Sequence, residues 1–98
     1  MSAPVYLGDA VSAAGYRLAG AQARTPARGD EAAALAWACG RAPLVLVSAA
    51  VAAALPEAVL RAALLALAPL VLVVPDREGR VALPDLAGRL REQLGLEA

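Results

Sequence analysis

The stretch VYLGDAVSAAGYRLAG, residues 5–20, decides the expected fold of this 98-residue chain. Residues 5–7 are apolar and predict a short buried strand, and Gly8 and Asp9 predict a turn after it. A helix is expected over residues 10–19, and Asp9 can cap it because a carboxylate accepts hydrogen bonds from free N–H groups of the first turn. The stretch therefore predicts a strand that leads directly into a helix.

The expected first helix carries an apolar stripe, because Val11, Ala14, Gly15 and Leu18 recur at helical spacing and fall on one face. Gly15 costs a helix about 1 kcal/mol relative to alanine. A close approach of the helix to the sheet is the expected compensation for that cost. Gly20 suits the left-handed conformation that ends many helices.

Two further apolar runs predict buried strands, over residues 44–47 and 70–74. Each run is rich in valine and is introduced by a proline, Pro43 or Pro69. Continuous apolar runs suit strands of a parallel sheet that helices cover on both faces. Residues 21–24 are short and half polar, which predicts an edge strand.

Helices are expected between these strands. Asp30 is the expected N-cap of a second helix that continues to Gly40, and Ser48 is the expected cap of a third helical region. Pro56 is expected to restart that region, since proline is favoured at the first helical position. The expected buried side of the restarted helix is marked by Leu60, Leu64 and Leu67.

The alternation of strands and helices predicts an α/β fold. We expect a small four-stranded parallel sheet of order 2-1-3-4, flanked by helices as in flavodoxin and CheY, within a globular domain at residues 1–80. Residues 81–98 are expected to form a C-terminal helix with Leu83, Leu86, Leu90 and Leu94 in one narrow stripe. Such a stripe suits a coiled-coil partner, but a helix that covers the sheet is an open alternative.

The composition excludes several classes of function. Nine acidic residues balance nine basic ones, and this neutral balance argues against a nucleic-acid partner. The chain is 60% hydrophobic, yet its most apolar region, residues 42–75, is broken by prolines and charges before it reaches the length of a membrane span. We therefore expect no direct membrane insertion. Residues 1–10 do not have the pattern of a signal peptide.

The chain has few residues of the types that catalyse reactions or bind metals and phosphates. The chain has no histidine and one cysteine, so metal ligand sets and nucleophile–base pairs have no candidates, and Cys39 is interpreted as buried filler. Gly8 with Asp9 makes neither a dinucleotide fingerprint nor a P-loop. A phospho-accepting receiver domain would need more acidic residues than Asp9, an aspartate where Ser48 stands, and a lysine. We expect no catalytic, cofactor or metal residues.

One part of the opening stretch resembles a known family, the F subunit of the V/A-type (vacuolar/archaeal-type) rotary ATP synthases and ATPases. The matching residues are Gly8, Asp9, Gly15, Tyr16, Arg17, Leu18, Ala19 and Gly20. Further similarity to the family lies in residues 30–32 at the expected start of the second helix, and in residues 44–48 and 69–75 at the expected third and fourth strands. Tyr16 stands where phenylalanine is more usual.

The resemblance implies a non-catalytic rotor subunit of the central stalk, with no enzymatic activity and no cofactor of its own. It implies a partner, the coiled coil of the D subunit, in a complex that makes or hydrolyses ATP and moves protons or sodium ions. The implied location is the cytoplasmic face of a membrane, within the peripheral ATPase sector. The last helix would provide the partner interface through Leu83, Leu86, Arg89, Leu90 and Leu94.

Two alternatives remain open from the residues. One is a small CheY-like signalling or regulatory module without phosphotransfer residues. The other is a ligand-binding, flavodoxin-like domain that would use the crevice at the carboxyl ends of the strands, where Gly8, Asp9 and Ser48 fall.

Overall fold

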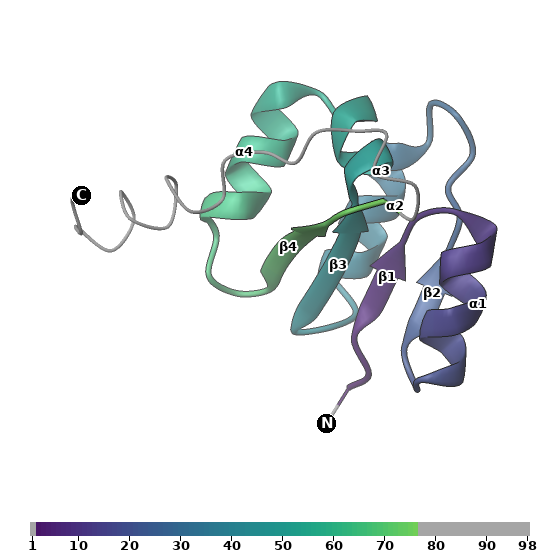
Figure 1. Cartoon of the computed structure of the whole chain (residues 1–98). Helices are drawn as coiled ribbons and strands as arrows, with labels where there is room; N and C mark the ends of the chain where they lie inside the picture. The colour runs from purple at the N-terminus through teal and green to yellow at the C-terminus, as the bar shows by residue number, and fades with distance from the viewer. Residues whose placement is uncertain (1, 77–98) are drawn as a thin grey trace, which may run out of the picture.

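The computed structural model describes residues 2–76, which form one parallel sheet with helices packed on it (Figure 1). The strands are β1 (Val5–Leu7), β2 (Gln22–Arg24), β3 (Leu44–Ser48) and β4 (Leu70–Val74). Their order is β2-β1-β3-β4, and all three pairings are parallel. The predicted α/β class and the strand order 2-1-3-4 are confirmed.

The helices are α1 (Ala10–Leu18), α2 (Glu31–Cys39), α3 (Ala49–Ala54) and α4 (Glu57–Leu65). The third helical region is thus two helices, and the chain turns between them at Leu55. Leu55 is extended, with φ −78° and ψ 146°, because a residue before proline avoids the helical conformation. Pro56 precedes the first residue of α4 and does not occupy it, one position away from the expectation.

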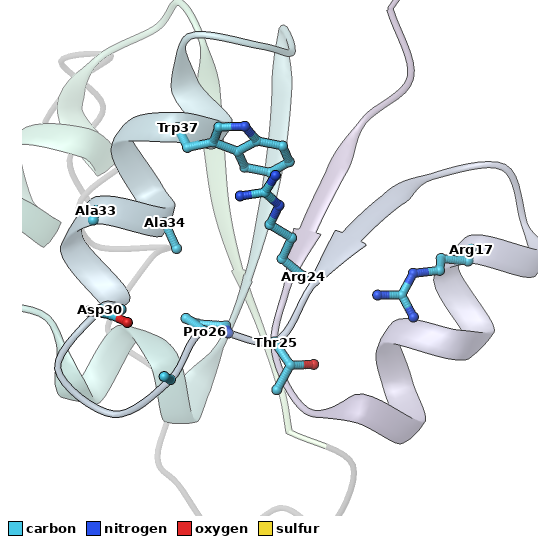
Figure 2. Close-up of a pocket in the computed structure, with 9 residues that line it drawn as sticks. Arg17, Arg24, Thr25, Pro26, Asp30, Ala33, Ala34 and Trp37 are labelled. Carbon is cyan, nitrogen blue, oxygen red and sulfur yellow. The ribbon is translucent and has the colours of Figure 1, made fainter.

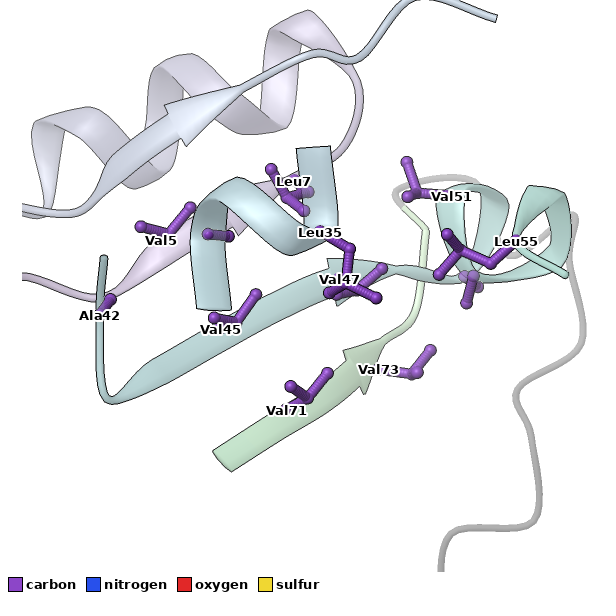
Figure 3. Close-up of a cluster of buried hydrophobic side chains, with 13 residues drawn as sticks. Val5, Leu7, Leu35, Ala42, Val45, Val47, Val51, Leu55, Val71 and Val73 are labelled. Atoms are coloured by element: carbon purple, nitrogen blue, oxygen red, sulfur yellow. The ribbon is translucent and has the colours of Figure 1, made fainter. Parts of the chain in front are cut away.

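One face of the sheet carries the larger core (Figure 3). Alternate strand residues point to this face, and α2, α3 and α4 pack over it. Leu35 from α2 and Leu55 after α3 are buried there, while Leu60 and Leu64 from α4 are partly buried against the same cluster. The strand members of this core are Val5, Leu7, Val45, Val47, Val71 and Val73.

The opposite face carries a smaller core that α1 covers. Tyr6 of β1 and Ala13 of α1 are buried there with Ala23 of β2. The rings of Tyr6 and Tyr16 stack with centroids 4.1 Å apart and an angle of 16° between the planes. This stack holds α1 on the sheet, since aromatic pairs contribute about 0.5–1.5 kcal/mol beyond the area that they bury.

The orientation of α1 differs from the expectation. Val11 is 63% exposed and Leu18 is 91% exposed, and Ala14 and Gly15 also face solvent. No neighbouring atom lies within 4 Å of the position that a Cβ on Gly15 would take, so the expected close approach to the sheet is wrong. Tyr16, stacked on Tyr6, turns the opposite side of the helix toward the sheet.

Two smaller expectations also need correction. Leu67 is 68% exposed, because α4 ends at Leu65 and the chain is extended at Ala66, where ψ is 138°. Asp30 precedes α2 as expected but makes no side-chain capping hydrogen bond. Oε1 of Glu31 instead accepts a hydrogen bond from the Gly29 N–H at 2.9 Å.

Several expectations lie outside the described residues. They are the domain boundary at residue 80, the C-terminal helix at residues 81–98 and its leucine stripe. In the part of the chain that the structure describes, no helix has the length and apolar character that a membrane span requires.

Candidate functional site

The turn between β1 and α1 is built by Gly8 and Asp9. A Cβ on Gly8 would overlap the ring and hydroxyl of Tyr6, so the side chain of Tyr6 requires glycine at this position. Oδ2 of Asp9 accepts a hydrogen bond from the Ser12 N–H at 3.0 Å, which confirms Asp9 as the cap of α1. These two residues therefore serve the local fold.

Arg17 protects the edge of the sheet. The N–H of Gln22 donates to the Pro4 carbonyl, and the Gly8 N–H donates to the Arg24 carbonyl. The backbone groups of Gln22 and Arg24 in β2 therefore point toward β1. Because backbone groups alternate along a strand, the Ala23 carbonyl between them points away from the sheet. Nη2 of Arg17 donates to that carbonyl at 2.8 Å. The bond occupies the outward acceptor of an edge strand that could otherwise pair with another chain.

The end of α1 uses Gly20, which has φ +101°. This left-handed conformation is open to glycine and strained for other residues, so the expected role of Gly20 is confirmed. Gly8, Asp9, Tyr16, Arg17 and Gly20 are thus all explained by the strand, turn and helix that they form. Gly15 and Leu18 are not explained in this way.

The solvent face of α1 is an apolar surface, which we call the α1 stripe. It consists of Val11, Ala14, Gly15 and Leu18, all of them exposed. The stripe runs from Val11 to Leu18, about 10 Å along the helix axis. The bare backbone at Gly15 leaves room for another helix to approach closely, since the distance between packed helices depends on the side chains at the contact.

The carboxyl ends of the strands form the second candidate site. Ser48 is 2% exposed at the end of β3, and its Oγ accepts a hydrogen bond from the Val51 N–H at 3.1 Å. The expected cap on α3 is confirmed, and the Ser48 hydroxyl faces the protein interior instead of solvent. In residues 2–76, no three His, Cys, Asp or Glu side chains gather as a metal site would need.

Tyr6 lies near the same end of the sheet. Burial raises the pKa of its hydroxyl above the ordinary value, and the negative charges of Asp9 and Asp76 raise it further. A hydrogen bond with the Ser12 side chain acts in the opposite direction on this pKa. The hydroxyl therefore stays protonated at neutral pH and serves as a packing and hydrogen-bonding group.

Cys39, at the end of α2, packs against the larger core and is partly buried. Burial raises the pKa of its thiol. A raised pKa lowers the thiolate fraction at neutral pH, which is the opposite of what a reactive cysteine needs. This environment agrees with the interpretation of Cys39 as a packing residue.

A groove beside β2 is a surface that the sequence did not indicate (Figure 2). Its volume is about 440 Å³, and it lies between the chain after β2 and the helix α2. The guanidinium of Arg24 stacks on the indole of Trp37, with Cζ 3.5 Å from the ring centroid. These residues belong to different elements, and no spacing rule connects them. The single tryptophan was the one available signal.

Comparisons with known proteins add no assignment: no protein-family model matches the chain, and no curated protein gives a significant match. The expected partner interface of the last helix, namely Leu83, Leu86, Arg89, Leu90 and Leu94, lies outside the described residues. The α1 stripe and the groove beside β2 are therefore the two surfaces on which a functional argument can be built.

Proposed function

We propose that this chain is a non-catalytic component of the central stalk of a V/A-type rotary ATPase or ATP synthase, which couples and modulates rotation through contact with the D subunit. The observation that carries the proposal is the α1 stripe. It lies within the same segment, residues 8–20, whose residues resemble the F subunit. It takes no part in the core of the described domain.

The α1 stripe is costly to leave in water. Leu18 and Val11 are 91% and 63% exposed. Complete burial of such side chains is worth about 1.5–3 kcal/mol each. A partner helix that covers both would gain a few kcal/mol, which is the contribution expected of the centre of an interface. The stripe therefore supports a protein whose function is to bind another protein.

The remaining family-like residues support a rigid attachment of α1. Asp9 caps the start of the helix, Tyr16 stacks on Tyr6, and Arg17 ties the last turn to β2. A helix held at both ends and in its middle can transmit force between a partner and the sheet without bending. This is the mechanical property that a rotor component requires.

The last helix is a second proposed contact with the D subunit, through the leucine stripe expected at residues 83–94. The alternative is that this stripe covers the sheet beside α1. Leu46, Leu72 and Val74 point to that face and are only partly buried within the described residues. Location in the peripheral ATPase sector, at the cytoplasmic face of a membrane, is part of the same proposal.

Co-expression with the coiled coil of the D subunit tests the proposal. We expect a stable one-to-one complex by size exclusion and mass measurement. Leu18→Asp is expected to weaken the complex strongly, because it places a charge in an apolar contact. Leu67→Asp is the matched control, since Leu67 is also an exposed leucine but lies after α4.

Two outcomes would count against the proposal. One is the absence of a complex with the D subunit under varied salt. The other is an equal effect of the two aspartate variants, which would remove the α1 stripe from the interface. Leu90→Asp, made in parallel, decides whether the last helix contacts the D subunit or packs on the sheet. Loss of the complex with an intact fold would indicate contact with the D subunit. Global unfolding would indicate packing on the sheet.

A further inference from the structure

The groove beside β2, which we call the β2-edge groove, has one basic and one apolar side. It is lined by Arg17, Arg24, Thr25, Pro26, Ala27, Asp30, Ala33, Ala34 and Trp37. Arg17 reaches toward it from α1, and Arg24 extends from the end of β2 to the indole of Trp37 (Figure 2). Alanines of α2 and the ring of Pro26 supply the apolar part of the wall.

The arginines at this edge are held in place before any ligand arrives. Arg24 stacks on Trp37 at 3.5 Å, and Arg41 approaches the same ring at 5.0 Å. Nε of Arg41 also donates to Oε1 of Gln22 at 3.0 Å, and Nη2 of Arg17 donates to the Ala23 carbonyl at 2.8 Å. Groups that are already ordered lose less conformational entropy when they bind.

These contacts do not neutralise the arginines. Within residues 2–76, the partners of the three guanidinium groups are an indole ring, a side-chain amide and a backbone carbonyl, all of them uncharged. A guanidinium has five N–H donors, so most donors of each group remain available for an anion. Asp30 is the one carboxylate among the lining residues, against Arg17 and Arg24. The groove therefore has a positive balance although the whole chain is neutral.

The partner cannot bind simply by adding a strand to β2. Arg17 already occupies the outward carbonyl of Ala23, in a strand of three residues. Recognition must therefore use side chains. Carboxylates suit the guanidinium groups, because the flat fork of arginine matches their two oxygens. Short apolar side chains suit the wall of alanine, proline and indole beside them.

We propose that the β2-edge groove is a docking surface for an acidic segment of a partner protein, with glutamate or aspartate side chains on Arg24 and Arg17 and an adjacent apolar side chain on Trp37 and Pro26. The combination of a basic and an apolar wall favours a peptide over a small anion, which would use the arginines alone. Tryptophan and arginine are also the residue types enriched where binding energy concentrates in protein interfaces. This surface is separate from the α1 stripe, which faces away from the sheet.

The single tryptophan makes the test direct, because Trp37 is the only indole in the chain and lies in the groove. The full chain is titrated with a synthetic peptide that repeats Glu-Glu-Leu, and the emission of Trp37 is followed. We expect a saturable change that weakens as salt is raised, since salt screens exposed charges. A peptide that repeats Gln-Gln-Leu is expected to bind at least about tenfold more weakly.

Arg24→Gln is the test variant and Arg61→Gln the matched control, because Arg61 is an exposed arginine on α4 that does not line the groove. We expect Arg24→Gln to lower the affinity for the acidic peptide by about tenfold or more and Arg61→Gln to leave it unchanged. Far-ultraviolet circular dichroism checks that both variants are folded. If Arg24→Gln fails to fold, the peptide comparison and the salt dependence of the unaltered chain decide the question.

Three results would overturn the proposal: equal binding of the two peptides, no effect of Arg24→Gln in the folded variant, or binding of inorganic phosphate as tightly as the acidic peptide. The last result would identify a small-anion site. The test is independent of the rotor proposal, since the complex with the D subunit is measured through Leu18. The groove proposal can therefore be refuted, by unchanged peptide binding in Arg24→Gln, while the complex with the D subunit is still observed.

Discussion

Replacement of Leu18 by alanine tests the orientation of α1, on which the proposed function depends. Leu18 is 91% exposed, so less than a tenth of its side-chain surface is removed from water. Full burial of a leucine is worth about 1.5–3 kcal/mol, and the contact that Leu18→Ala loses is therefore only about 0.1–0.3 kcal/mol. The slightly better helix propensity of alanine offsets part of that loss.

The same change at Leu35 provides the contrast. Leu35 is 3% exposed on α2 and belongs to the larger core. Leucine-to-alanine changes at buried sites cost about 2–5 kcal/mol, since they combine lost burial with a cavity. For a domain of this size, 1 kcal/mol shifts the midpoint of thermal unfolding by about 4–8 °C. We expect a shift of at most about 2 °C for Leu18→Ala and of about 8 °C or more for Leu35→Ala.

The assay is denaturant and thermal unfolding of both variants beside the unaltered chain. Circular dichroism reports the helices, and the emission of Trp37 reports the packing of α2. A loss of more than about 1.5 kcal/mol in the free energy of unfolding of Leu18→Ala would contradict the outward orientation. The α1 stripe would then be part of the core, and the proposed partner contact would lose its basis.

Two further predictions concern polar groups in the cores. Ser48→Ala is expected to lower the free energy of unfolding by about 0.5–2 kcal/mol, because the buried Val51 N–H loses its acceptor. Ser2→Ala, at an exposed position, is the control in the same denaturation assay. Equal stabilities of the two variants would refute the capping role of Ser48. Burial raises the pKa of Tyr6 above the ordinary value of 10.0, so the native state retains this proton more tightly than the unfolded state. The stabilising contribution is complete below about pH 10 and is lost as the pH rises through the higher native pKa, so unfolding midpoints should fall in that alkaline range and fall less in Tyr6→Phe.

Much of the fold followed from local patterns. The strands at residues 44–48 and 70–74 were predictable because continuous valine-rich runs, each introduced by a proline, are typical of strands buried in a parallel sheet. The caps at Asp9 and Ser48 were predictable because a short polar side chain before a helix satisfies free N–H groups. The restart of the third helical region at Pro56 was predictable from the proline itself, and the structure differs only in placing Pro56 before the first residue of α4.

The candidate surfaces were less accessible to prediction. Helical spacing identified Val11, Ala14, Gly15 and Leu18 as one stripe but could not show which way the stripe faces. The pairing of Arg24 with Trp37 joins a strand to a helix across a loop, and no periodicity relates their positions. Exposure and contacts between elements are properties of the packed chain, so both surfaces required the structure.

The sequence by itself thus determined the order of strands and helices, the parallel sheet and the end of α1 at Gly20. Each of these depends on short-range apolar patterns and backbone preferences. The direction of α1 was determined by packing across the sheet. The stack of Tyr16 on Tyr6 and the bond from Arg17 to the Ala23 carbonyl join α1 to two separate strands. Contacts of this kind exist only after the chain has folded, and they are what turns the α1 stripe toward solvent.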